Sequence, residues 1–284
     1  MNIEQWDEHR QIKAAMDILV QSMDESSEMK KMESHIFKSG GKTIRPIILM
    51  LTTEMCGGDP KKSIDAALAI ELTHSASLIH DDLLDGGIIR RGMPSTHKKF
   101  GYAAAMLCGD YLISKSIELV SPYGRNVIRD FGRAGMAMAE GETMDIKSSN
   151  GEFKEKDYFE CIRKKTASLF AASASMGAYI GGADDEIAGQ CRYFGECVGT
   201  AYQIVDDILE YLQVQDDKKS TQESMTLPYI YLKSMSPEDA VNKSISEVEK
   251  HVERANDIIE TFKPCEATNK LLQITNYITI DMLP

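Results

Sequence analysis

Two acidic clusters of the same spacing lie inside strongly apolar stretches of this 284-residue chain, and they constrain its fold more than any other feature. The first is Asp81, Asp82 and Asp85 within SLIHDDLLD, and the second is Asp206, Asp207 and Glu210 within QIVDDILE. Residues four positions apart share one face of a helix, so the outer members of each cluster point together. Carboxylates almost never enter such apolar surroundings unpaired. Each helix must therefore be buried on most sides and still bring its carboxylates to a cation.

Apolar residues recur at the helical period along almost the whole chain. Turn signals such as the Gly-Gly-Asp-Pro segment at 57–60 and the Gly-Gly pair at 86–87 separate these stretches. The sequence predicts helices over residues 9–37, 43–56, 61–85, 101–120, 124–146, 155–181, 184–213, 223–233, 237–262 and 266–281. Strand signals are scarce, and neither a linker nor a fixed-period repeat divides the chain. We therefore expect an all-α, single-domain helical bundle over residues 1–284.

The composition is that of a globular protein without a membrane span. Apolar residues make up 43% of the chain, which is enough for a core, and no run of 18 apolar residues predicts a membrane-spanning helix. The N-terminal segment MNIEQWDEHRQIK lacks the apolar core of a signal peptide. The six cysteines form neither a C-x-x-C pair nor a zinc-spaced cluster with histidine. We therefore expect reduced thiols in a cytoplasmic protein.

Two adjacent arginines, Arg90 and Arg91, follow the first acidic cluster. Carboxylate oxygens with room for water favour Mg²⁺, usually with a substrate phosphate as co-ligand, and arginine suits bidentate phosphate binding. The pattern therefore predicts metal-assisted handling of a diphosphate, although a single acidic cluster could also be a solvated helix face. The formal net charge of −12 argues against a nucleic-acid partner. An acidic protein that binds diphosphate needs cations to reverse the local sign.

Five ordered segments together resemble those of the trans-isoprenyl diphosphate synthases, the polyprenyl synthetase family. They are SGGKTIRP at 39–46, HDDLLDGGIIRRGMPSTH at 80–97, CGDYL at 108–112, KKTASLF at 164–170 and YQIVDDILE at 202–210. The resemblance spans about residues 10–280, and five segments in order are far more specific than a lone Asp-Asp-x-x-Asp. It implies the isoprenoid synthase fold with a central active cavity. It also implies a prenyltransferase that condenses isopentenyl diphosphate with an allylic diphosphate.

The resemblance further implies a role for each matched polar residue. Three Mg²⁺ ions would be held, two by Asp81 and Asp85 with Asp82 behind them, and one by Asp206 with Asp207 and Glu210. The allylic diphosphate would contact Arg90 and Lys165, and isopentenyl diphosphate would contact Lys42, Arg45, His74 and Arg91. Thr166 and Gln203 would line the reacting centre. Taken singly, His74 could be an ordinary core histidine and Lys42 a solvated lysine, but the Gly-Gly pair before Lys42 supplies free backbone N–H groups for an anion.

One segment departs from the family pattern. The chain reads EYLQVQDDKKSTQESMTLP from 210 to 228, where the family usually has two Gly-Lys elements. Glu223 and Ser224 replace the second, and Lys218 or Lys219 could substitute for the first. The chain could therefore be a chain-elongating synthase acting as a homodimer, or a degenerate, mainly non-catalytic subunit of a heteromeric synthase. A terpene cyclase would explain the first acidic cluster but not SGGKTIRP.

Small side chains precede the first acidic cluster at Thr73, Ala76 and Ser77. On a helix they lie along the wall where a growing prenyl tail would run from the metal site. The resemblance implies that bulky aromatics at 76 and 77 would stop elongation early. We therefore expect a product of twenty carbons or more, unless the small residues only allow close helix packing.

Overall fold

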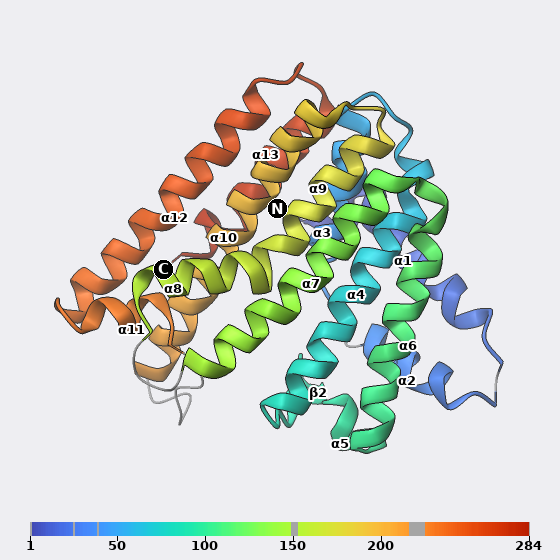
Figure 1. Ribbon diagram of the computed structural model, residues 1–284, viewed down its shortest axis with the longest axis horizontal. Coiled ribbons are helices and arrows are strands. Elements are labelled where there is room, and N and C mark those ends of the chain that lie inside the picture. Colours follow the sequence, from blue (N-terminus) through green and yellow to red (C-terminus); the bar gives the residue numbers. More distant parts are fainter. Residues whose placement is uncertain (1, 25, 39, 149–152, 216–224, 284) are drawn as a thin grey trace.

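The computed structural model describes residues 2–24, 26–38, 40–148, 153–215 and 225–283 as one bundle of helices (Figure 1). The first half of the chain forms η1 (Ile3–Gln5), α1 (Asp7–Gln21), α2 (Glu28–Lys38), α3 (Ile44–Met55), η2 (Pro60–Ser63), α4 (Ile64–Leu84), β1 (Ile89–Arg90), β2 (Met93–Pro94), α5 (Thr96–Phe100), α6 (Tyr102–Val120), η3 (Ser121–Tyr123) and α7 (Arg125–Ser148). The second half forms α8 (Glu155–Ile162), η4 (Arg163–Ala167), α9 (Ser168–Ile180), α10 (Asp185–Gln215), α11 (Leu227–Leu232), α12 (Pro237–Glu260), α13 (Glu266–Ile278) and η5 (Ile280–Met282). The all-α prediction is confirmed.

The N-terminal region contains two helices where the sequence predicted one over 9–37. The break falls after α1, at a polar segment that begins with Ser22. There the Asp24 carboxylate accepts hydrogen bonds from the Ser26 backbone N–H (2.8 Å) and hydroxyl (2.7 Å). Short side chains that bond to nearby backbone in this way compete with helix formation. The helix over 9–37 was predicted from apolar periodicity alone, which does not reveal such side-chain bonding.

Two further differences lie close to the cavity described below. The predicted helix over 155–181 is interrupted by η4, a π-helical segment, and the loop after α4 contains a short antiparallel hairpin, β1–β2. The hairpin is too short to show an alternating pattern in the sequence. Residues 223 and 224, where one predicted helix begins, lie outside the described residues, as do Lys218 and Lys219.

The core forms around α4 and α9, whose side chains are apolar on nearly every face. Eleven of the residues of α4 are buried, and α9 is buried along ten consecutive residues from Leu169 to Ala178. Small side chains let α9 approach its neighbours closely. A Cβ on Gly177 would lie 2.0 Å from the Thr52 hydroxyl of α3. The tightly packed interior holds α4 and α10, the two helices that carry the acidic clusters, in fixed relative positions.

None of the helices in the described ranges combines the length and the apolar run that crossing a bilayer would require.

Candidate active site

The first acidic cluster occupies the C-terminal turn of α4. Asp81 is half-buried, and Asp85 is the exposed C-cap residue whose backbone N–H donates to the Asp81 carbonyl. Asp82 is only 5% exposed, and its Oδ1 accepts two hydrogen bonds from the Arg90 guanidinium, at 2.7 and 3.1 Å. Burial, followed by the neighbouring charge of Glu142, raises the pKa of Asp81 to about 7. Asp82 thus orients Arg90, whereas Asp81 lies close to the negative charge of Glu142.

The second acidic cluster lies near the C-terminal end of α10. As in the first cluster, one carboxylate faces the cavity and the next one is buried and hydrogen-bonded. Asp206 is exposed to the cavity, whereas Asp207 is buried. The Asp207 carboxylate accepts hydrogen bonds from the Tyr158 hydroxyl (2.6 Å) and the Gln203 amide (2.9 Å). Burial outweighs both bonds and raises the pKa of Asp207 to about 7. Glu210 lies half-buried one turn further along.

A polar cavity of about 410 cubic ångströms separates the two acidic clusters. Its walls come from α3, α4, the β1–β2 hairpin, α7, the π segment η4, α9 and α10. It brings together the predicted site residues Arg45, His74, Asp81, Arg90, Arg91, Lys165, Thr166, Gln203 and Asp206. Asp82 and Asp207 lie behind this wall, where they bond to Arg90 and Gln203. The cavity therefore collects basic groups beside one carboxylate from each cluster.

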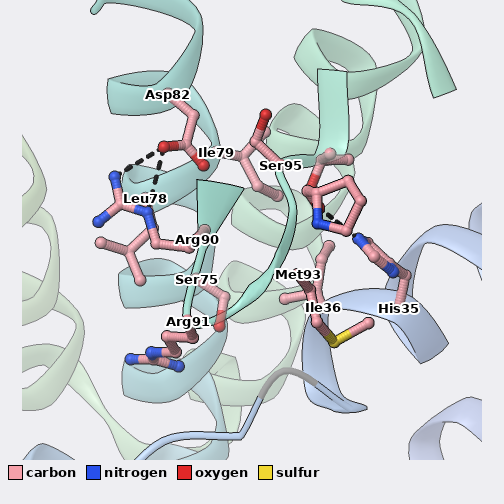
Figure 2. Close-up of a pocket in the computed structure, with 12 residues that line it drawn as sticks. His35, Ile36, Ser75, Leu78, Ile79, Asp82, Arg90, Arg91, Met93 and Ser95 are labelled. Carbon is pink, nitrogen blue, oxygen red and sulfur yellow. Dashed lines mark hydrogen bonds and ion pairs between the residues drawn. The ribbon is translucent and has the colours of Figure 1, made fainter. Parts of the chain in front are cut away.

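The β1–β2 hairpin carries Arg90 and Arg91, and both side chains line the cavity. Figure 2 shows the hairpin from the side of His35, with Arg90 directed to Asp82. Its two central residues, Arg91 and Gly92, have φ of 52° and 77°, the left-handed pair that a tight two-residue hairpin turn requires. So short a hairpin needs outside support. Arg90 is tied to Asp82, the Arg91 guanidinium donates to the Gly40 carbonyl, and His35 Nε2 donates to the Pro94 carbonyl (2.8 Å). His35 was not anticipated from the sequence.

Arg45 and His74 form a hydrogen-bonded pair in the cavity wall. Arg45 Nη1 donates to His74 Nε2 at 3.3 Å, and the guanidinium lies 4.3 Å from the centre of the Phe170 ring. Burial, and then the charges of Arg45 and the hairpin arginines, keeps the pKa of His74 well below its usual value. His74 is therefore a neutral acceptor that orients Arg45. Within the described residues, no ion pair to a carboxylate involves Arg45, so its charge is available to an anion in the cavity.

The π segment places two consecutive side chains, Lys165 and Thr166, in the cavity wall. Lys165 Nζ forms ion pairs with Asp145 (2.6 Å) and Glu142 (2.7 Å) of α7. The Thr166 hydroxyl donates to Gln203 Oε1 at 2.6 Å. Since the Gln203 amide donates to Asp207, a continuous chain of hydrogen bonds runs from the π segment to the second acidic cluster.

Glu142 and Asp145 were missed in the sequence analysis. They lie in EGETMD at 140–145, which reads as an ordinary charged helix face. Their position depends on how closely α7 approaches the π segment, where a Cβ on Gly141 would lie 2.3 Å from the Lys165 backbone nitrogen. No spacing rule within one helix predicts that approach.

An apolar groove of about 850 cubic ångströms begins beside Asp81 and Lys165 and runs between α4, α6 and α7. Its polar end includes His80, Glu142 and Thr143, and the rest of its lining is almost entirely apolar or small. Along α7 the lining extends from Ile146 to Ile128, and α6 contributes Ile113, Ile117 and Val120. A charged cavity therefore opens into a long apolar groove, with Ser77, Asp81, Met138 and Lys165 shared by both.

Ser77 and Thr73 line this groove, as the sequence analysis expected. The expectation for Ala76 is wrong. Its side chain is fully buried in the core and is absent from the groove lining. Successive residues of a helix point about 100° apart, so Ala76 faces inward while Ser77 faces the groove.

The chain matches the model of the family described as polyprenyl synthetase over residues 26–262. It belongs to the polyprenyl synthetase family. It is 57% identical to "Geranylfarnesyl diphosphate synthase" of Methanosarcina mazei, over all of this chain and 96% of that protein. The solved "Geranyltranstransferase" of Methanosarcina mazei superposes with a TM-score of 0.89 at 55% identity, covering both chains completely. A "Geranylgeranyl Pyrophosphate Synthetase" structure from Geoglobus acetivorans gives a TM-score of 0.87 at 26% identity, covering 96% of this chain and 98% of that one.

Polyprenyl synthetases are Mg²⁺-dependent, and the donor set of the polar cavity fits that ion. No three His, Cys, Asp or Glu side chains converge into a metal cluster in the described part of the chain. Burial, and then the nearby charges of Glu142 and Asp85, raise the pKa of Asp81, so a cation would stabilise its ionised form. Oxygen ligands that leave several coordination positions open are what Mg²⁺ uses when a substrate phosphate completes its shell.

Lys42 lies outside the polar cavity lining, although its neighbours in SGGKTIRP lie close to it. Its Nζ is 4.8 Å from the Tyr277 ring centre and 3.9 Å from Met282 Sδ. The exposed Lys42 side chain thus packs against the C-terminal helix and the segment that follows. Its assignment to isopentenyl diphosphate stays a prediction.

Proposed function

We propose that this prenyltransferase condenses isopentenyl diphosphate with allylic diphosphates and releases geranylfarnesyl diphosphate, a 25-carbon product. The observation that carries the proposal is the junction of the charged cavity and the apolar groove at Asp81, Ser77 and Lys165. A diphosphate needs the first and a growing hydrocarbon tail needs the second. The 57% identical relative named for the 25-carbon product supports the chain length.

Asp81, Asp85 and Asp206 would hold Mg²⁺, with three ions in the loaded enzyme. When bound, the metal neutralises the diphosphate charge that grows as the allylic carbon–oxygen bond breaks. Asp82 would serve by holding Arg90 in place, and Asp207 by holding Gln203. Glu210 lies one turn from Asp206 and would support its side of the cavity.

Arg90 and Lys165 would bind the diphosphate that leaves, because both lie beside Asp81 in the cavity wall. Arg45 and Arg91 would bind the diphosphate of isopentenyl diphosphate, oriented by the neutral His74. Fixed cations aimed at developing negative charge require little reorganisation during the reaction. Lys42 would join them if its contact with Tyr277 opens.

Thr166 and Gln203 would act where the allylic cation forms. The hydrogen bond from Thr166 fixes the Gln203 carbonyl oxygen, and the bond to Asp207 fixes its amide. A carbonyl dipole held in this way would stabilise the carbocation while the apolar groove keeps water from its tail. The new bond then joins the allylic C1 to C4 of isopentenyl diphosphate, and a proton leaves C2 of that unit.

A second copy of the chain would cover the open side of the groove. Nine large apolar side chains are exposed on α6 and α7: Tyr102, Met106, Leu107, Tyr111, Ile113, Ile117, Ile128, Met136 and Ile146. Five of these also line the groove. An apolar face of this kind is typical of a protein–protein interface, and in a homodimer the same face of a second copy would lie against it.

The decisive assay incubates the purified chain alone with isopentenyl diphosphate, farnesyl diphosphate and Mg²⁺, and analyses the products by chromatography after dephosphorylation. The expected result is a 25-carbon alcohol whose formation stops on chelation of Mg²⁺. Size-exclusion chromatography with light scattering should give twice the chain mass of 31.6 kDa. Activity that appears only with another synthase polypeptide would instead establish the heteromeric subunit.

A further inference from the structure

Eight glycines lie within the long helices of the bundle, and they fall into two groups. At Gly109, Gly141, Gly177, Gly195 and Gly199, a Cβ would lie closer than 3.0 Å to an atom of another element. Close packing therefore requires those five. At Gly132, Gly135 and Gly189, a Cβ would meet no atom of the described residues within 4 Å. Glycine destabilises a helix interior, so a glycine without a packing partner needs another explanation.

Two of the three unexplained glycines, Gly132 and Gly135, lie in the middle of α7 and line the apolar groove. The third, Gly189, is on α10 and lines none of the cavities described above. Ile128, Met136 and Ala139 surround the two α7 glycines on the same face of the helix. A side chain at 132 or 135 would therefore point into the groove rather than into protein.

We propose that Gly132 and Gly135 are specificity-determining residues that keep the groove wide enough for the tail, so that the missing side chains at these two positions permit the later elongation cycles. The inference rests on the proposed function and adds where along the groove the tail passes. The helical stability given up at each position is the cost of an open path for the hydrocarbon.

Distances along α7 give the order of the effects. Relative to Glu142 beside Asp81, Gly135 lies 7 positions and Gly132 lies 10 positions deeper, or about 10 and 15 Å at the helical rise. An extended isoprene unit spans about 5 Å, given four carbon–carbon bonds of about 1.5 Å in a zigzag. A bulky side chain at 135 should therefore stop the tail about one isoprene unit earlier than the same side chain at 132.

The test compares Gly132→Leu, Gly135→Leu and the control Gly189→Leu in the assay above. We expect shorter products from both α7 variants, with Gly135→Leu one five-carbon unit shorter than Gly132→Leu, and the wild-type product from Gly189→Leu. Unchanged product length in active Gly132→Leu and Gly135→Leu enzymes would overturn the proposal. If the wild type itself forms no prenyl product, the proposed function fails, and the glycines are not at issue.

Alanine variants keep the test independent of folding. Gly132→Ala, Gly135→Ala and Gly189→Ala should each raise the thermal midpoint by about 2–4 °C, because alanine favours the helix and meets open space. Product shortening by Gly135→Ala but not by Gly189→Ala would support the proposal. If the α7 variants instead become monomeric in light scattering and their residual product length is unchanged, the glycines serve contact with a second copy, and the proposal is wrong.

Discussion

The polar cavity and the apolar groove share a boundary at Asp81, Ser77 and Lys165 but are built in different ways. Several charged groups of the cavity have a partner that fixes them, such as Asp82 for Arg90 and Asp145 for Lys165. The groove is formed by apolar side chains and by glycines that leave space. Charge requires specific partners in a low-dielectric site, whereas a flexible hydrocarbon requires only an apolar volume. Substitutions in the cavity should therefore stop turnover, and substitutions in the groove should change the product.

The largest effect is expected from Asp81→Asn, which would test the cavity side of this division. Loss of the carboxylate removes a ligand for the metal and leaves the diphosphate charge poorly neutralised. Turnover should fall by about 10³-fold or more in steady-state kinetics, with the fold intact by circular dichroism. Asp65→Asn, an exposed change on the same helix, is the matched control. Asp81→Asn turnover within tenfold of wild type would remove Asp81 from the metal site.

Ser77→Phe tests the groove side. The phenyl ring would enter the groove one helical turn from Asp81, closer to that end than a side chain at 135. Products should therefore be at least as short as those of Gly135→Leu, while turnover stays within about tenfold of wild type. Product chromatography and initial rates measure the two quantities separately.

Ala76→Phe provides the contrast to Ser77→Phe. Its side chain would enter a filled core, and overpacking should cost about 1–3 kcal/mol of unfolding free energy. A correctly folded Ala76→Phe enzyme with shortened products would show that the groove reaches both residues.

A pH dependence of stability should come from Asp207 in the cavity region. Its pKa is raised to about 7 in the folded protein from an ordinary value of 3.8, so the folded state binds the proton more tightly than the unfolded state. This contribution to stability is greatest below about pH 4, declines as pH rises to about 7, and is constant above that, a total of a few kcal/mol. In metal-free buffer, urea unfolding curves recorded at several pH values should show a smaller decline of the unfolding free energy with pH in Asp207→Asn than in the wild type.

Tyr158→Phe is the complementary variant for Asp207. It removes a hydrogen bond that favours the ionised carboxylate, so it should destabilise the protein by about 1–3 kcal/mol at pH 8 and by less at pH 5. A wild-type stability that is independent of pH between 4 and 7 would contradict the assignment to Asp207.

The smallest effect is expected from Thr73→Val in the groove wall. The Thr73 hydroxyl is buried and has no hydrogen-bond partner among the described residues, so an isosteric methyl group should stabilise the protein by about 1 kcal/mol. Product length should not change, because the shape of the groove is preserved. A shifted product distribution would show that the groove depends on polarity as well as volume at this depth.

The helical bundle and most of the charged cavity were predictable from the sequence, because apolar periodicity and ordered motifs are local signals. Nine of the residues expected at the site line one cavity, although they come from five separate elements. Three features were not predictable. The Asp24 turn that separates α1 from α2 depends on side-chain bonding, the Glu142–Lys165–Asp145 cluster depends on a helix-to-helix approach, and the π segment depends on a hydrogen-bond pattern without a compositional signature. The sequence predicted that Ser77 lines the groove but did not predict the role of Gly132 and Gly135. An empty volume between helices produces no recognisable sequence pattern.

The π segment Arg163–Ala167 has a consequence for how the site tolerates mutation. A turn closed by i→i+5 bonds contains one more residue than an α-helical turn. Deleting one residue would convert the segment to a regular α-helix, whereas a substitution leaves the extra residue in place. Such a deletion would rotate either Lys165 or the residues beyond it by about 100°. The orientation of Lys165 and Thr166 is thus encoded in the number of residues rather than in their identity. An insertion or deletion between α8 and α9 would be more damaging here than most replacements.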